Sequence, residues 1–98
     1  MHTTIRRYEG VQSENVPEII KRVKEGFVPL ISSSGGFKRY QFLNAGNGVV
    51  ITISVFETEA AAWASNKMAA SWVEENLSTL LNSPTQIAVG EALIEKSG

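Results

Sequence analysis

The stretch from Val49 to Phe56 constrains the fold more than any other part of this chain of 98 residues. Its side chains alternate in the period of a β-strand, and both of the resulting faces are largely apolar. One face carries Val49, Ile51, Ile53 and Val55, and the other carries Val50, Thr52, Ser54 and Phe56. A strand with two apolar faces has to be covered on both sides. A layer of helices is expected on one face, and something else must cover the other.

A β-hairpin is predicted around this strand. Phe37 to Leu43 is the first arm, and Asn47-Gly48 is the tight turn because both residues accept a positive φ angle. The second arm is the stretch from Val49 to Phe56.

A helix is predicted before the hairpin. Asn15 caps it, Pro17 is tolerated in its first turn, and apolar residues then follow helical spacing. Pro29 conflicts with this pattern, because proline has no N–H and crowds the preceding turn. A kink is therefore expected near Gly26–Pro29, with the helix resuming to about Ser32.

The remaining segments complete a β-α-β-β-α-β order. Thr3 to Glu9 and Thr85 to Ile94 are predicted strands, and Ala60 to Leu77 is a predicted helix capped by Thr58. This order predicts an α+β, ferredoxin-like domain over residues 1–98, in which two helices cover one face of a four-stranded antiparallel sheet. We expect the bare face to carry Val50, Thr52, Ser54 and Phe56, or their neighbours one register over. It is too apolar to stay in water, so the same face of a second subunit should cover it.

The composition excludes several classes of function. Nine Lys and Arg face ten Asp and Glu, which argues against a nucleic-acid partner or a membrane surface. There is no Cys and a single histidine, His2, so neither a metal site nor a thiol nucleophile is expected. No signal peptide and no spanning helix is recognisable, and we expect a cytoplasmic protein.

The sequence resembles the antibiotic-biosynthesis-monooxygenase-like group of the dimeric α+β barrel superfamily. Three stretches carry the likeness: Gly26-Phe27-Val28-Pro29-Leu30-Ile31 with Gly36-Phe37, Ile53-Ser54-Val55-Phe56-Glu57-Thr58-Glu59-Ala60-Ala61-Ala62, and the Ala-rich helix that follows. The resemblance implies a homodimer whose sheets pack face to face, with small-molecule ligands between the sheet and the helices of each subunit. Some members oxidise aromatic polyketides with oxygen and no cofactor, and others degrade haem. Haem degraders use a helical His, which this chain lacks, so no cofactor is expected.

Asn66 is the candidate catalytic residue. Asn is a weak helix former in an otherwise Ala-rich helix, and its amide could orient a substrate oxygen or stabilise an enolate. The alternative is a local bond to the backbone or a place on the surface. Trp63, one turn away, is the candidate aromatic wall of a ligand cavity, or else a core or dimer contact. Together with Ala69, Trp72 and Val73 it marks the expected apolar side of the helix.

Arg6, Tyr40 and Phe27 complete the candidate substrate-binding set. Arg6 and Arg7 alternate across the first strand, so one of them must face a covered side, where it pairs with a carboxylate such as Glu91 or holds an anionic substrate. Tyr40 is a half-buried sheet residue or a hydroxyl aimed into the cavity.

The resemblance implies three functions, which these residues weigh against one another. The first is a small-molecule-binding barrel protein that acts as a cofactor-independent monooxygenase on an aromatic or quinone-like substrate. The alternative is a non-enzymatic, ligand-sensing or stress-associated dimer with a vestigial pocket. An isomerase or lyase is the third, and it is disfavoured because no strong general base stands out.

Overall fold

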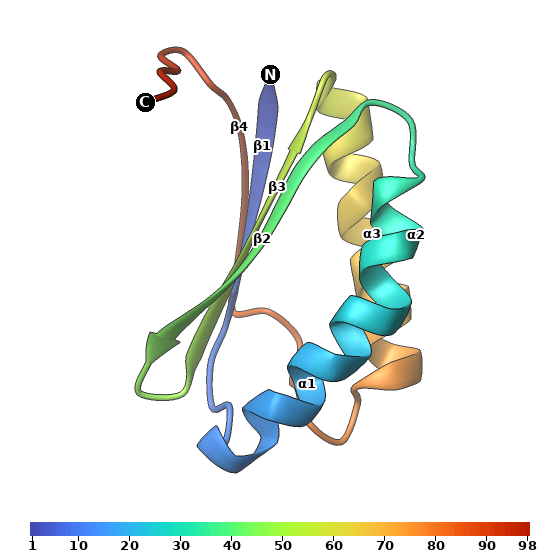
Figure 1. The fold of residues 1–98 in the computed structure, drawn as a ribbon, viewed down its shortest axis with the longest axis vertical. Coiled ribbons are helices and arrows are strands. Elements are labelled where there is room, and N and C mark those ends of the chain that lie inside the picture. Colours follow the sequence, from blue (N-terminus) through green and yellow to red (C-terminus); the bar gives the residue numbers. More distant parts are fainter.

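The computed structural model describes residues 1–98 and has the ferredoxin-like βαββαβ order that the sequence predicts. The elements are β1 (His2–Tyr8), η1 (Ser13–Asn15), α1 (Val16–Arg22), η2 (Val23–Phe27), α2 (Val28–Ser32), β2 (Phe37–Gly46), β3 (Val49–Phe56), α3 (Glu59–Asn76) and β4 (Gln86–Glu91). The strands form one antiparallel sheet in the order β2-β3-β1-β4. The helices all lie on one face of this sheet, and the other face is bare (Figure 1).

The first helical segment is continuous from α1 to α2 but contains a wide turn at η2. In this turn the N–H of Val28 donates to the carbonyl of Val23, five residues back, as in a π-helix. Pro29 follows directly and has no N–H to offer to an α-helical ladder. The wide turn accommodates the proline, so the kink predicted near Gly26–Pro29 and the helix end at Ser32 are both confirmed.

Aromatic contacts at this turn join the first helical segment and α3 to the sheet. A Cβ atom added to Gly26 would lie 2.9 Å from Cζ2 of Trp72 on α3, so only glycine allows the indole to approach this closely. The Trp72 ring also packs on Phe27, with 5.4 Å between centroids. Phe27 in turn meets Tyr40 of β2 edge to face at 5.6 Å. These three rings fill the space between η2, α3 and the sheet.

The register of the strands decides which side chains face the helices. Arg6 of β1 and Phe42 of β2 both lie opposite Thr52 of β3, so the three share a face. The residues of β3 on this inner face are Val50, Thr52, Ser54 and Phe56, and all of them are buried. This corrects the first of the two registers expected from the sequence, which placed them on the bare face. The bare face carries the neighbours one register over, and its apolar residues are Ile5, Leu43, Val49, Ile51, Ile53 and Val55.

Helix α3 begins at the predicted cap and buries a narrow stripe of small residues. The Thr58 hydroxyl oxygen accepts a hydrogen bond from the N–H of Ala61 at 3.1 Å. The buried residues are Ala62, Ser65, Asn66 and Ala69. Trp63 does not belong to this stripe, because 52% of its surface is exposed. Its expected place on the apolar side of the helix is therefore wrong.

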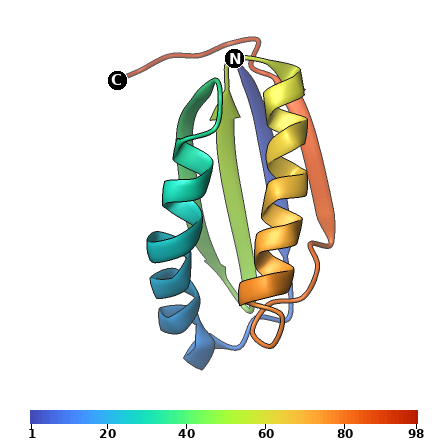
Figure 2. The same cartoon turned by 90° about the vertical axis from the view of Figure 1, so that its right-hand side faces the viewer.

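Strand β4 is shorter than predicted and lies at one edge of the sheet (Figure 2). It ends at Glu91 rather than at Ile94, after which the chain turns away from the fold. None of the helices combines the length and the apolar composition that crossing a bilayer requires.

The Gly26–Trp72 contact generates a stability prediction. Gly26→Ala should lower the free energy of unfolding by about 1–3 kcal/mol, because the added methyl group forces the indole away from the turn. This loss opposes and exceeds the gain of up to about 1 kcal/mol that alanine brings to an ordinary helix position. Urea denaturation measures the difference. Gly35→Ala is the matched control, since its added Cβ meets nothing within 4 Å. An unchanged or more stable Gly26→Ala protein would contradict the packing described above.

Candidate ligand-binding site

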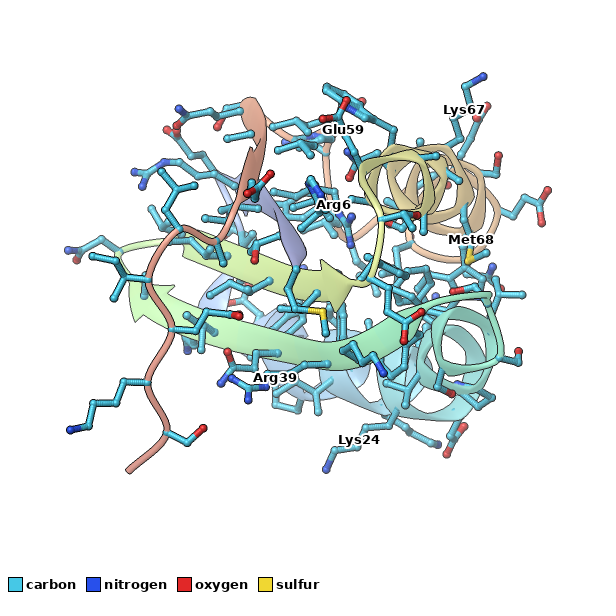
Figure 3. The ribbon with its side chains drawn as sticks, turned by 90° about the horizontal axis from the view of Figure 1, so that it is seen from above. Arg6, Lys24, Arg39, Glu59, Lys67 and Met68 are labelled. Carbon is cyan, nitrogen blue, oxygen red and sulfur yellow. The ribbon has the colours of Figure 1, made fainter.

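A buried arginine occupies the centre of the inner face of the sheet. Alternation along β1 turns Thr4, Arg6 and Tyr8 toward the helices, and all three are buried. Only 2% of the Arg6 surface is exposed. Figure 3 shows Arg6 in the space between the sheet and α3, whereas Lys67 on α3 points into solvent. Arginine is rarely buried to this extent unless it has a partner.

The partner of Arg6 is the side chain of Asn66. Oδ1 of Asn66 accepts a hydrogen bond of 2.8 Å from Nη1 of Arg6 and a second one of 2.9 Å from the hydroxyl of Thr4. Asn66 reaches this position because it lies on the buried stripe of α3, directly above β1. Sequence reasoning named Asn66 and Arg6 separately, and the structure brings them into contact.

No carboxylate neutralises the Arg6 guanidinium. Pairing with a carboxylate such as Glu91 was one of the expectations for this side chain, but Glu91 is exposed and lies opposite His2 at the far end of β1, whereas Ile87 lies opposite Arg6. That expectation is wrong. The ion pairs of the chain lie on the surface and join Arg7 to Glu9, Arg22 to Glu18 and Lys38 to Glu57.

Unsatisfied polar atoms surround the Arg6–Asn66 pair. Four buried atoms have no hydrogen-bond partner: Nε of Arg6, Nδ2 of Asn66, Oγ1 of Thr52 and Oγ of Ser54. Each such atom costs about 1–3 kcal/mol of stability when it is buried. Native proteins keep few of them, so a cluster around one buried charge calls for a partner such as a bound water, ion or ligand.

A cavity of about 520 Å³ adjoins this cluster. It lies between α3, β4 and the loop that joins them. The lining residues are Arg6, Tyr8, Asn66, Ala70, Val73, Glu74, Ser78, Leu81, Asn82, Ser83, Pro84 and Ile87. The volume lies within the range of roughly 300–1,000 Å³ that small-molecule sites occupy. The cavity therefore combines apolar walls with a cationic, hydrogen-bonding floor.

Trp63 lies beside this cavity rather than inside it. It lines a shallow hollow of about 580 Å³ on the outer side of α3, together with Ala64 and Lys67. Asn66 and Ala70 line both the hollow and the main cavity, so the two spaces are adjacent. The half-exposed indole thus presents a flat apolar surface next to the Arg6–Asn66 pair.

Phe27 and Tyr40 do not line the main cavity, which corrects the expectation of a single pocket shared with Trp63 and Asn66. They surround a second void of only about 20 Å³, which shares Arg6, Tyr8, Val73 and Leu81 with the main cavity. Burial raises the pKa of the Tyr40 hydroxyl well above its ordinary value, against the opposing effect of the Arg6 charge. Tyr40 is therefore a protonated core residue at neutral pH and not a base.

Two side chains of the cavity that carry chemistry, Tyr8 and Glu74, lie outside the candidate set drawn from the sequence. Glu74 is exposed but is the only carboxylate among the lining residues. It lies eight residues after Asn66, which is about 80° further around the axis of an α-helix. Helical spacing from Asn66 therefore gave no clear signal for Glu74.

The absence of a counter-charge generates a second stability prediction. Arg6→Met removes the buried charge, while Thr4 still donates to Asn66. The free energy of unfolding should therefore stay equal to that of the wild type or rise by about 1–3 kcal/mol. Urea denaturation tests this, with Lys24→Met as a control at an exposed position that points away from the fold (Figure 3). A loss of more than about 1 kcal/mol would identify Arg6 as a structural residue, since such losses need a specific structural cause.

Comparison with known proteins gives structural relatives only. No family model and no curated protein matches the sequence. A protein of unknown function from Nitrosomonas europaea is 23% identical, with a TM-score of 0.75 over 99% of this chain and 93% of the other. The haem degrader MhuD from Mycobacterium tuberculosis, solved with two haems in its active site, is 20% identical, with a TM-score of 0.73 over 99% and 100%.

A monooxygenase from Streptomyces coelicolor, solved in complex with nanaomycin D, is also similar. It is 17% identical, with a TM-score of 0.69 over 98% of this chain and 92% of the other. At these identities the likeness establishes a shared architecture. The chain therefore shares the fold of these three proteins.

Proposed function

We propose that this protein binds an aromatic or quinone-like small molecule in the 520 Å³ cavity and acts on it as a cofactor-independent monooxygenase. The observation that carries the proposal is the buried Arg6–Asn66 pair, because both of its residues line a cavity of ligand size. The similarity to a monooxygenase with nanaomycin D bound supports the same class of chemistry.

The reaction needs only an electron-rich substrate and molecular oxygen. A hydroxyarene loses its phenolic proton, and the resulting anion supplies electrons to oxygen. One oxygen atom replaces the hydrogen of a ring C–H group as a new carbonyl, and the other leaves as water. A naphthol and one oxygen molecule thus give a naphthoquinone and one water.

The chain supplies groups suited to the anionic stage of this reaction. The Asn66 amide and the Arg6 guanidinium stabilise negative charge on the substrate oxygen, in the manner of an oxyanion hole. The proton is released at the rim of the cavity, where the exposed Glu74 carboxylate lies. The Trp63 indole offers a stacking surface for a ring that extends into the adjacent hollow.

The lining residues do not fit a haem. They include no His, Cys or Met that could hold the iron, and the one lining side chain of a haem-ligating type, Tyr8, is buried in the core. The single histidine, His2, lies on β1 opposite Phe56 and Glu91. No group of three or more His, Cys, Asp and Glu side chains is placed to hold a metal ion. The haems bound by MhuD are therefore not carried over to this chain.

The non-enzymatic alternative expected an interior packed solid by Phe27, Phe42 and Trp72. These three residues do enclose a void of only about 20 Å³. None of these three residues lines the main cavity. Its presence favours ligand binding over a vestigial pocket.

We also propose that two copies of the chain pair through the bare face of the sheet. Ile53 lies near the centre of that face, opposite Ile5 on β1 and Gln41 on β2. Ile5 and Leu43 are each at least 40% exposed there. An apolar sheet face of this kind is stable in water when a second, identical face covers it.

Oxygen consumption tests the enzymatic proposal. The wild-type protein should consume one oxygen molecule per molecule of quinone formed from a panel of naphthols and anthrols. Asn66→Ala should lower kcat about 10²-fold, because it removes a donor to the developing oxyanion. Asn76→Ala, an exposed position at the end of α3, is the control and should leave kcat unchanged. Equal turnover by the Asn66 variant and the wild type would remove Asn66 from the mechanism.

The oligomeric state tests the second proposal. The wild-type protein should scatter light as a dimer. Ile53→Lys should give a monomer, because it places a charge at the centre of the apolar contact. Ser71→Lys introduces the same charge at an exposed position on α3 and should leave the dimer intact. A monomeric wild type, or a dimeric Ile53→Lys protein, would show that this face is not the interface.

A further inference from the structure

We infer that the ligand is an aromatic acid with a hydroxyl group next to its carboxylate, and that the carboxylate pairs with Arg6. This inference rests on the proposed function for the use of the cavity. The charge on Arg6, the free edge of its guanidinium group and the shape of the cavity carry it.

The first argument is charge. Arg6 is the only buried side chain among the nine Lys and Arg of the chain. Its single partner is the neutral amide oxygen of Asn66, which satisfies one N–H group but leaves the positive charge uncompensated. A buried cation is stabilised by an anion far more than by neutral dipoles, because the surrounding dielectric is low.

No group of the chain supplies that anion. Glu74 is the only carboxylate that lines the cavity, and it is exposed, faces solvent and forms no ion pair with Arg6. Tyr40 lies near Arg6, and burial raises the pKa of its hydroxyl, which keeps this side chain neutral. The counter-charge is therefore expected from the ligand.

The second argument is geometry. Nη1 of Arg6 is occupied by Asn66, and no hydrogen bond is made by the other two nitrogens of the guanidinium group. Nε and Nη2 form one edge of the group, and such an edge matches the two oxygens of a carboxylate. Nε is covered by protein, so a carboxylate that uses both donors has to displace the side chains over Nε. This planar match favours a carboxylate over a spherical anion.

The side-chain amide of Asn66 adds a donor for a third ligand oxygen, next to the two oxygens of the carboxylate. Nδ2 of Asn66 has no partner, and the Arg6–Asn66 hydrogen bond of 2.8 Å holds the amide beside the guanidinium group. A ligand whose hydroxyl lies next to its carboxylate presents its oxygens along a single edge. Arg6 then receives the carboxylate, and Asn66 donates to the hydroxyl oxygen that becomes anionic during oxidation.

The walls of the cavity fit the rest of such a molecule. The side chains of Tyr8, Val73, Leu81 and Ile87 give the space above the polar floor an apolar surface. A fused pair of aromatic rings buries its faces against these residues while its polar edge remains at Arg6. Ile87 is 45% exposed without a ligand, so binding would also cover an exposed apolar residue of β4.

Calorimetric titration with two matched probes tests the inference. 1-Hydroxy-2-naphthoate carries the carboxylate, and 1-hydroxy-2-naphthamide replaces it with a neutral amide of nearly the same shape. We expect the carboxylate to bind the wild-type protein at least about tenfold more tightly, as a charge-assisted pair predicts. Arg6→Met should abolish this preference, and Lys24→Met should retain it.

The outcomes separate this inference from the proposed function. Equal or tighter binding of the amide by the wild-type protein overturns the inference, and that comparison needs no variant to fold. If the naphthoate is preferred but no oxygen is consumed, the ligand class stands and the monooxygenase proposal fails. If neutral naphthols are oxidised while neither probe binds, the enzyme stands and the inference fails. If nothing binds and nothing is oxidised, both are wrong.

Discussion

The hydrogen bond between Arg6 and Asn66 is the interaction on which this account of the molecule depends. It joins the central strand β1 to helix α3 across 60 residues of sequence, in a part of the interior where water is excluded. It satisfies one N–H group and leaves a full positive charge beside a cavity. The buried charge lowers the stability of the fold. Hydrophobic packing elsewhere must offset this loss, at Phe27, Ile19, Ile31 and Phe56 among others.

The position of the cavity follows from how the helices cover the sheet. The kinked segment from α1 to α2 covers β2 and β3. The rings of Phe27, Tyr40 and Trp72 fill the space between this segment, α3 and the sheet. Helix α3 covers β1 with small side chains and leaves the inner side of β4 partly open, so that Ile87 is still exposed (Figure 2). The interior is thus divided into a packed half and an open half, and Arg6 lies between them.

Much of the fold could be predicted because its signals are local. The Asn47-Gly48 turn has positive φ angles of 53° and 77°, which these two residue types accept, and Pro29 fixes the kink. The facing of β3 could not be predicted, because both of its faces are apolar. Trp63 was assigned to the wrong side of α3, because a helix rich in alanine offers few large side chains to mark its buried side. The Arg6–Asn66 contact joins residues that lie far apart in the sequence, so no spacing pattern could predict it, although each residue was singled out.

The most direct test is an NMR titration that follows the side-chain Nε–H groups of the arginines. Arg6 is buried, so its Nε–H should be protected from exchange and visible, whereas those of Arg7, Arg22 and Arg39 lie at the surface. On addition of 1-hydroxy-2-naphthoate, the Arg6 resonance should shift and saturate, and 1-hydroxy-2-naphthamide should move it less. A titration that leaves the Arg6 resonance in place, or moves only those of the surface arginines, would contradict the assignment of Arg6 as the anion-binding group.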